Sequence, residues 1–321
     1  MSKPRVWVTR YIPTEGLQEL AECSEMEISE RPLTKEEIMA KLPTIDAMLC
    51  VGTPLGEEEL AVAKKLRIIS NYGVGYNHID IDAATRYGIM VTNLPYDVTE
   101  ATADLTFGLL LASARRIAEA DRALRSGERL EWGPMLLNGH DVYGKTLGII
   151  GLGRIGRAVA RRALGFNMKI LYYDICRQYE AENAMGVEFR PKDELLQEAD
   201  FVSLHVPLTT ESRHLIGKRE LALMKPTAYL INSSRGPVVD EGALLEALQT
   251  GAIAGAGLDV FEHEPKLTPG LTDCPNVVMT PHVGTSTAET RIRMAKAAAA
   301  NIIAVFKDEK PPFLVNEEVL S

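Results

Sequence analysis

The sequence predicts an α/β protein with two doubly wound, parallel-sheet domains, one inserted into the other. Short apolar segments alternate with helix-like segments along most of the 321 residues, which is typical of βαβ units. A glycine-rich turn with its own strand and helix begins only near the middle of the chain, at Gly151. The length suits roughly two domains of about 150 residues each.

The first hundred residues have no such glycine turn but show the same alternation. The expected strands are Arg5–Thr9, Met26–Ser29, Ala47–Val51, Arg67–Ser70 and Met90–Asn93, and the expected helices are Glu15–Glu22, Lys35–Leu42, Glu57–Lys65 and Asp82–Tyr87. Strands that alternate with helices predict a parallel sheet.

A long helix is expected from Thr99 to about Arg125, because apolar residues recur there at helical spacing. After a polar stretch, strands are expected at Thr146–Ile150, Lys169–Tyr173, Phe201–His205, Ala228–Asn232, Ala254–Leu258 and Val277–Thr280, and a last helix at about Ala288–Phe306. We therefore expect one domain at 100–287, inserted into another made of 1–99 and 288–321.

The central glycine turn has the context of a dinucleotide site. It follows an apolar strand, reads Gly151-Leu152-Gly153-Arg154-Ile155-Gly156, and opens into the helix-like run Arg157–Leu164. Glycines permit the tight turn and the close approach of a pyrophosphate, and the helix N-terminus offers free N–H groups. This segment predicts a Rossmann domain.

An acidic residue ends the next expected strand. Asp174 follows Gly156 at about the ~20-residue spacing of a ribose-binding carboxylate. A carboxylate there accepts hydrogen bonds from ribose hydroxyls and repels a 2′-phosphate, so NAD(H) is favoured. Arg177 lies close by and keeps NADP(H) as the alternative.

Composition excludes several functional classes. The formal net charge of −9 argues against a nucleic-acid surface. No apolar run reaches the ~18 residues of a membrane span, and no leader follows Met1, so we expect no membrane partner and a cytoplasmic protein. The four cysteines are scattered without metal-ligand spacing, so we expect no metal site.

Three side chains on loops after expected strands suit the reduction of a 2-keto acid. Arg235 offers a permanent cation for a carboxylate. His282 suits a general acid, and a carboxylate such as Glu264 stabilises an imidazolium. Taken singly, each has an ordinary alternative: a surface arginine, a structural histidine and a solvated loop acid. Spacing alone does not bring the three together.

The order of motifs resembles that of the D-isomer-specific 2-hydroxyacid dehydrogenases. The matching stretches are Tyr72–Asp80, Gly151–Gly156, Asn232–Asp240, Gly257–Pro265 and Pro281–Ser286, and Thr99–Ala112 looks most like the glyoxylate/hydroxypyruvate reductase branch. The resemblance implies a flavodoxin-like split substrate domain, a substrate crevice between the domains, and a homodimer. Asn77 departs from the Asp of many relatives.

The resemblance also implies residue roles. Arg235, Glu264 and His282 would be catalytic, and Val74, Gly75, Arg235 and Trp132 would contact substrate, with Trp132 reaching the partner subunit. The implied cofactor contacts are Thr102, Gly151, Gly153, Arg154, Ile155, Gly156, Asp174, Val206, Pro207, Ser233, Ser234, Asp259, His282 and Gly284.

The implied activity is NADH-dependent reduction of glyoxylate or hydroxypyruvate. Two alternatives keep the fold and change the substrate: D-3-phosphoglycerate dehydrogenase, and a phosphite or formate dehydrogenase. A third alternative is an NAD-sensing binding protein that resembles the corepressors of this family.

Overall fold

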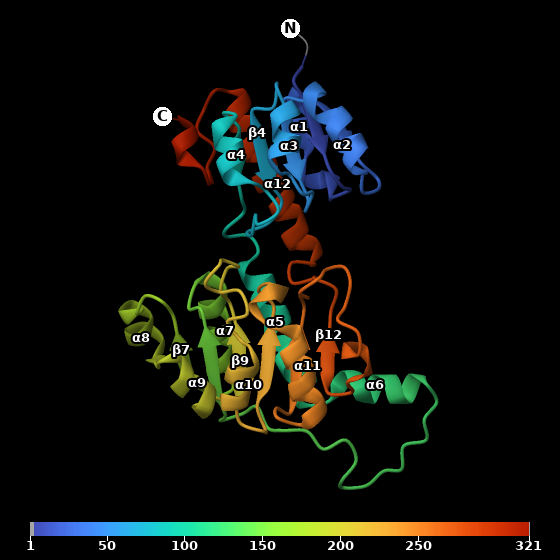
Figure 1. The fold of residues 1–321 in the computed structure, drawn as a ribbon, viewed down its shortest axis with the longest axis vertical. Helices are drawn as coiled ribbons and strands as arrows, with labels where there is room; N and C mark the ends of the chain where they lie inside the picture. Colours follow the sequence, from blue (N-terminus) through green and yellow to red (C-terminus); the bar gives the residue numbers. More distant parts are fainter. Residues whose placement is uncertain (1–2, 321) are drawn as a thin grey trace. The chain divides into compact units, whose positions relative to one another are not determined.

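The computed structural model describes residues 3–320 and divides into two compact units. Unit 1 consists of Met1–Val98 and Thr285–Ser321, and unit 2 consists of Thr99–Gly284. Figure 1 colours the two segments of unit 1 mainly blue and red, and unit 2 from green to orange. Unit 2 thus interrupts unit 1 along the chain.

Unit 1 has a five-stranded parallel sheet in the order β2-β1-β3-β4-β5. This is the flavodoxin-like order, which confirms the fold predicted for this part of the chain. Its strands are β1 (Arg5–Val8), β2 (Glu25–Ile28), β3 (Ala47–Cys50), β4 (Ile68–Asn71) and β5 (Met90–Thr92), and its α-helices are α1 (Gln18–Cys23), α2 (Lys35–Lys41), α3 (Glu57–Val62), α4 (Ile81–Arg86) and α12 (Ala288–Phe306).

Alternate residues of the unit 1 strands supply two apolar clusters. Val6 and Val8 of β1 pack with residues of α1 and α12, whereas Trp7 packs with residues of α2, α3 and α4. Successive side chains of a strand point to opposite faces, so helices cover both faces of this sheet. The last helix of the chain, α12, is therefore part of the core of unit 1.

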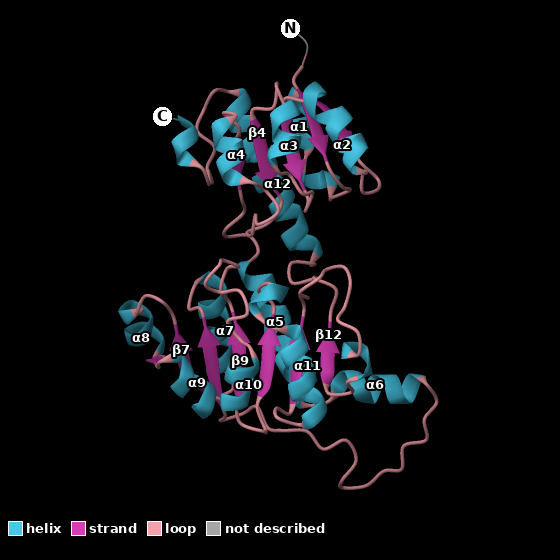
Figure 2. Cartoon of the chain, in the orientation of Figure 1, coloured by secondary structure: helices cyan, strands magenta, loops and turns pink. Residues whose placement is uncertain are grey.

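Unit 2 has a seven-stranded parallel sheet in the order β12-β11-β10-β9-β6-β7-β8 (Figure 2). The order reverses at β6, as in a Rossmann domain. The strands are β6 (Thr146–Ile150), β7 (Lys169–Tyr173), β8 (Glu188–Phe189), β9 (Phe201–Leu204), β10 (Tyr229–Asn232), β11 (Gly255–Leu258) and β12 (Val277–Met279). The α-helices are α5 (Thr99–Ala114), α6 (Ile117–Arg125), α7 (Arg154–Leu164), α8 (Tyr179–Met185), α9 (Lys192–Glu198), α10 (Lys218–Leu223) and α11 (Glu241–Thr250).

Both faces of the unit 2 sheet are also covered. Ile149 packs with α5 and α7, and its neighbour Ile150 packs with α9, α10 and α11 on the other face. With both faces buried, the polar ends of the strands and the loops that follow them carry the exposed chemistry. No helix within residues 3–320 is long and apolar enough to cross a membrane.

The prediction of a single helix from Thr99 to about Arg125 is wrong. The helix ends at Ala114, and α6 starts at Ile117 after Arg116, whose backbone is left-handed with φ 54°. His140 donates its N–H to the Ala114 carbonyl at 2.8 Å, so a later segment satisfies the end of α5. A residue in the left-handed conformation at a helix end is usually Gly or Asn, so the arginine at this position did not indicate that the helix ends here.

Candidate active site

The glycine turn joins β6 to α7 and has the shape that a dinucleotide requires. Gly151 has φ +94°, and a Cβ there would lie 2.7 Å from the His205 carbonyl oxygen. A Cβ on Gly156 would overlap the carbonyl oxygen of Gly151, whereas a Cβ on Gly153 would meet nothing within 4 Å. The turn is therefore tight on one side and open on the side where a pyrophosphate would approach.

The helix after this turn begins at Arg154, earlier than the predicted Arg157, with Gly153 as its N-cap. Arg154 and Ile155 thus form the first turn of α7, and the N-terminal turn of a helix favours an anion. Val206 lies against the turn, with its Cγ1 2.9 Å from the position of a Cβ on Gly151. Pro207 follows it in the chain and accepts a hydrogen bond from Ser212 Oγ at 2.6 Å.

Asp174 lies at the end of β7 beside the glycine turn. Its Oδ2 accepts the Leu152 N–H at 2.8 Å, and its Oδ1 accepts the Cys176 N–H at 3.4 Å. These bonds hold the carboxylate at the edge of the turn, where the adenosine ribose of a bound dinucleotide would lie. The placement fits the ribose role predicted for Asp174.

The nearby Arg177 is engaged by another side chain. Its guanidinium makes two hydrogen bonds to the Glu182 carboxylate, at 2.8 and 2.9 Å, and lies 4.8 Å from the ring centre of Tyr179. Glu182 also accepts the Tyr172 hydroxyl at 2.6 Å. The Arg177 hydrogen bonds, followed by that of Tyr172, lower the pKa of Glu182 to about 2.

The loop after β10 carries Arg235. The Asn232 side chain organises this loop: its Oδ1 accepts the Ser234 N–H at 3.0 Å and the Ser234 hydroxyl at 2.8 Å, and its Nδ2 donates to the Arg235 carbonyl. The hydroxyls of Ser233 and Thr106 lie 2.5 Å apart in the core. Sequence reasoning missed Asn232 and Thr106, although an Asn at a strand end is a known turn signal.

The Arg235 side chain is largely withdrawn from water. Burial lowers the pKa of its guanidinium, and the negative charge of Glu264 opposes that shift. One nitrogen, Nη1, donates to the Ser234 carbonyl at 2.7 Å. A partly buried guanidinium is a strong binding group for a carboxylate, because solvent screens it less.

Glu264 and His282 form the ion pair that the resemblance implies. The Glu264 Oε2 and His282 Nδ1 atoms lie 2.8 Å apart. Glu264 Oε1 accepts the Phe261 N–H at 2.9 Å. Burial raises the pKa of Glu264, but hydrogen bonds from His282 and Phe261 and the charges of His282 and Arg235 outweigh it and lower the pKa.

The charge of Glu264 determines the tautomer of His282. An ionised carboxylate only accepts hydrogen bonds, so Nδ1 of His282 carries a proton and Nε2 is the nitrogen left for substrate. The side chain of His282 is half exposed, and a cavity of about 340 Å³ opens beside it, lined by Phe261, Glu264, Pro265, Leu267, Met279, Thr280, Pro281 and His282. His282 therefore lines this cavity together with Glu264, and Arg235 is not among its lining residues.

Asp259 holds the histidine loop. Its Oδ1 accepts the Thr280 hydroxyl at 2.6 Å and the Val283 N–H at 2.8 Å, and its Oδ2 accepts the Gly284 N–H at 2.8 Å. Its carbonyl accepts the His282 N–H at 2.8 Å. Asp259 is 1% exposed, so its visible function is to shape the loop; sequence reasoning did not single out Thr280.

Thr102 lies in the first turns of α5, next to the histidine loop. It is buried rather than on the helix surface, and a Cβ on Gly284 would lie 3.4 Å from its Cγ2. Thr102 and Gly284 are thus brought together with Asp259. This grouping joins α5 to the loop after β12 within unit 2.

Val74 and Gly75 lie in unit 1, on the loop after β4. Asn71 Nδ2 donates to the Gly75 carbonyl at 3.1 Å, and Asn93 Nδ2 donates to the Val74 carbonyl at 2.9 Å. These two hydrogen bonds fix the carbonyl groups of the loop. Val74 is 37% exposed, which suits the predicted contact with a ligand.

Trp132 lies on the segment 126–145, which connects the end of α6 to the start of β6 (Figure 1). It is 93% exposed, and Met135 and Leu124 are also largely exposed. The adjacent helix α6 has no buried residue. Within unit 2, Trp132 therefore contacts none of the catalytic side chains.

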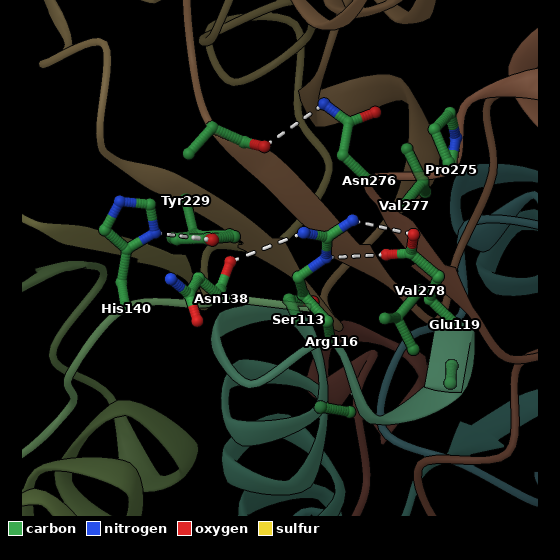
Figure 3. A pocket seen from close by; sticks show the side chains of 13 residues that line it. Ser113, Arg116, Glu119, Asn138, His140, Tyr229, Pro275, Asn276, Val277 and Val278 are labelled. Atoms are coloured by element: carbon green, nitrogen blue, oxygen red, sulfur yellow. Dashed lines mark hydrogen bonds and ion pairs between the residues drawn. The ribbon is translucent and has the colours of Figure 1, made fainter. Parts of the chain in front are cut away.

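A second cavity, of about 210 Å³, lies at the amino ends of the unit 2 strands. Figure 3 shows that its polar side chains pair with their neighbours: Arg116 with Glu119, and His140 with the Tyr229 hydroxyl at 2.9 Å. Ligands of doubly wound sheets bind at the carboxyl ends. The loops after β10, β11 and β12, which carry Arg235, Glu264 and His282 at the carboxyl ends of the strands, are therefore the candidate active site.

Comparisons with known proteins agree with this geometry. Residues 107–284 match the model of the "D-isomer specific 2-hydroxyacid dehydrogenase, NAD binding domain" family. A glyoxylate reductase of Korarchaeum cryptofilum is 52% identical over 324 aligned residues, which cover 99% of this chain and 97% of the relative.

Two solved structures are also similar over nearly their whole length. A glyoxylate reductase from Paecilomyes thermophila has a TM-score of 0.88 at 33% identity, covering 99% of this chain and 100% of that one. An NADPH-dependent glyoxylate/hydroxypyruvate reductase from Sinorhizobium meliloti, in complex with NADP and malonate, has a TM-score of 0.87 at 33% identity, covering 99% and 98%. The chain belongs to the D-isomer-specific 2-hydroxyacid dehydrogenase family and is an oxidoreductase with an NAD-binding domain.

Proposed function

We propose that this protein reduces a small 2-keto acid, glyoxylate or hydroxypyruvate, to the 2-hydroxy acid with NADH. The observation that carries the proposal is the Glu264–His282 pair, 2.8 Å apart beside a cavity and within the electrostatic influence of the partly buried Arg235. Relatives about 50% identical over the full length are glyoxylate reductases, which supports the choice of substrate.

Arg235 binds the substrate carboxylate and orients the carbonyl. Its guanidinium is planar and permanently charged, and its burial strengthens the attraction to an anion. Val74 and Gly75 remain proposed substrate contacts, as the family resemblance implies. The residues 1–99 and 288–321 are accordingly proposed as the substrate domain, and 100–287 as the nucleotide domain.

His282 protonates the carbonyl oxygen during reduction through Nε2, because Nδ1 donates to Glu264. The negative charge of Glu264 stabilises the imidazolium form, which is the form that has a proton to give. The nicotinamide cofactor, when bound, supplies the hydride. In the oxidation direction, neutral His282 accepts the proton from the hydroxyl.

NADH is the proposed cofactor, although a relative is NADPH-dependent. Asp174 is positioned to accept ribose hydroxyls and to repel a 2′-phosphate, and Arg177, the cation that would neutralise such a phosphate, is engaged by Glu182. The remaining contacts in the proposed cofactor set are Thr102, Gly151, Gly153, Arg154, Ile155, Gly156, Val206, Pro207, Ser233, Ser234, Asp259, His282 and Gly284.

A homodimer completes the proposal. The exposed apolar residues of α6 and of the segment 126–145, Trp132 above all, are suited to burial against a second copy of the chain. Trp132 then contacts the substrate pocket of the partner. Light scattering on the purified protein measures the mass; a monomer at working concentration contradicts this part of the proposal.

A substrate panel tests the activity. Glyoxylate, hydroxypyruvate, pyruvate, 2-ketogluconate and phosphohydroxypyruvate are each assayed with NADH and with NADPH, by the loss of reduced-cofactor absorbance, beside the His282→Ala variant. Turnover of glyoxylate or hydroxypyruvate with NADH, reduced roughly 10²-fold or more in the variant, is expected. Preference for phosphohydroxypyruvate supports a phosphoglycerate dehydrogenase, and NADH binding without turnover of any acid supports a sensor.

A further inference from the structure

A buried carboxylate outside the proposed catalytic set contacts the loop that carries Glu264. Glu241 is the first residue of α11 and is 3% exposed. Its Oε1 accepts the Glu262 N–H at 2.6 Å, and its Oε2 accepts the Thr268 hydroxyl at 2.5 Å. Within residues 3–320 it has no ion pair with a cation, so these hydrogen bonds must offset the cost of its burial.

The two contacts lie on either side of Glu264 in the chain. Glu262 precedes Glu264 by two residues, and Thr268 follows it by four. One carboxylate therefore ties together the start and the end of the turn whose tip bears the partner of His282. We propose that Glu241 is a positioning residue, which holds Glu264 at hydrogen-bond distance from His282; this inference rests on the proposed function.

Other contacts make Glu241 part of a tightly fitted support. The Glu241 N–H lies 3.4 Å from Glu262 Oε2, and Glu262 Oε1 contacts His214 Nε2 at 2.6 Å and Arg213 at 3.2 Å. A Cβ on Gly236 would overlap the carbonyl of Phe261. The loop that carries Glu262 and Glu264, the acid loop, is thus in close contact with residues 236–241. Because the two segments are packed closely, a change at Glu241 alters the position of this loop.

Glu241 accepts two hydrogen bonds, one from the Glu262 N–H and one from the Thr268 hydroxyl. A carboxylate presents an oxygen to each donor, whereas an amide presents one oxygen and one NH₂ group. In Glu241→Gln, the amide oxygen can keep the Glu262 N–H, because the Thr268 hydroxyl can rotate and accept from the NH₂ group. In Glu241→Ala both bonds are lost and the Glu262 N–H is left buried without this partner, so the turn is released.

Release of the turn has a specific kinetic consequence. When Glu264 moves away from His282, the imidazolium is less stabilised, and the alkaline limb of the pH profile for reduction moves to lower pH. Binding of the keto-acid carboxylate depends on Arg235, on the loop after β10, so kcat falls more than KM rises. A role in folding alone lowers the melting temperature without moving the pH limb.

The test uses the full-length protein, with glyoxylate and NADH. The variants are Glu241→Ala, Glu241→Gln, Thr268→Val and, as the reference for loss of the His282 partner, Glu264→Gln. The matched control is Glu246→Gln, an exposed acid of the same helix paired with Lys218. Each is measured for melting temperature, NADH binding by fluorescence and kcat/KM against pH. Glu241→Ala is expected to lower kcat by roughly tenfold or more, with the pH limb shifted as in Glu264→Gln, and Glu241→Gln to restore most of it.

A double variant tests whether Glu241 acts on the reaction through Glu264. Glu241→Ala added to Glu264→Gln is expected to cause little further loss, because both changes act on one contact. If the pH limb of Glu241→Ala stays at the wild-type position, or if the losses add in full, the positioning role is refuted. Should Glu241→Ala fail to fold, Thr268→Val still tests one of the two bonds: an unmoved pH limb there counts against the role. A wild-type protein inactive toward keto acids refutes the proposed function instead.

Discussion

Replacement of Glu264 by Gln removes one charge from the catalytic pair and little else. The side chain keeps its size, and its oxygen can still accept the Phe261 N–H, now 2.9 Å from Oε1. The NH₂ group then faces the protonated Nδ1 of His282, where two donors meet, so the 2.8 Å hydrogen bond of the wild type is lost. The imidazolium loses its anionic partner.

The magnitude follows from the geometry and the exposure of the pair. A hydrogen bond to a charged group contributes roughly 1.5–3 kcal/mol. The His282 and Glu264 side chains are 50% and 35% exposed, so solvent screening reduces that contribution. About 1.4 kcal/mol remains, which corresponds to about a tenfold loss in the reduction rate. Because the charge of Glu264 favours the protonated donor, its removal lowers kcat/KM by about that factor and moves the alkaline fall of the reduction rate to lower pH.

The assay is kcat/KM for glyoxylate, with NADH at saturation, across the pH range in which the variant stays folded. His205 provides the control: burial lowers its pKa to about 3, so it does not titrate in the working range, and His205→Gln leaves the limb where it is. A limb that does not move in Glu264→Gln refutes the assignment of Glu264 and His282 as the acid pair.

Four further changes test the rest of the site. Arg235→Lys loses planar, bidentate recognition, and KM for glyoxylate is expected to rise by about tenfold or more in steady-state assays. Glu182→Gln frees Arg177, and fluorescence titration is expected to show severalfold tighter NADPH binding that a second change, Arg177→Ala, abolishes. Gly156→Ala drives a Cβ into the glycine turn, so calorimetry is expected to show a lower melting temperature and weaker NADH binding. Trp132→Ala is expected to weaken the dimer in sedimentation equilibrium; unchanged association contradicts the interface.

The pattern of apolar residues was sufficient to predict most of the fold. The eleven expected strands are present, each within one residue of its predicted ends. Most are continuous apolar segments, as expected of parallel strands buried on both faces, whereas the edge strand β2 alternates exposed and partly buried residues. The two-residue strand β8 (Glu188–Phe189) was too short to leave such a pattern. The break at Arg116 was missed for a different reason: the turn depends on a distant contact, the His140 N–H on the Ala114 carbonyl.

The site was predictable only in part. The side chains proposed to react are marked by their motifs in the sequence, whereas the residues that hold them in place are not. Arg235, Glu264 and His282 lie on loops after strands, and parallel strands bring those loops to one edge of the sheet. The groups that hold them are ordinary residues elsewhere in the chain. Glu241 reads as a helix-start acid favoured by the helix dipole, and nothing in the local sequence marks its contact with the Glu262 N–H.

The backbone of His282 shows why the supporting groups matter to the reaction. Its φ is 54°, a left-handed conformation that costs a non-glycine residue roughly 1 kcal/mol or more and persists only where its surroundings hold it. Asp259 stabilises this conformation, because its carbonyl and both carboxylate oxygens accept hydrogen bonds from the backbone of the histidine loop. In this conformation Nδ1 lies 2.8 Å from Glu264 Oε2, and the side chain is part of the cavity lining. The position of the proton donor is thus determined by two buried acids, Asp259 for the histidine loop and Glu241 for the acid loop, and the catalytic contact exists where the two loops meet.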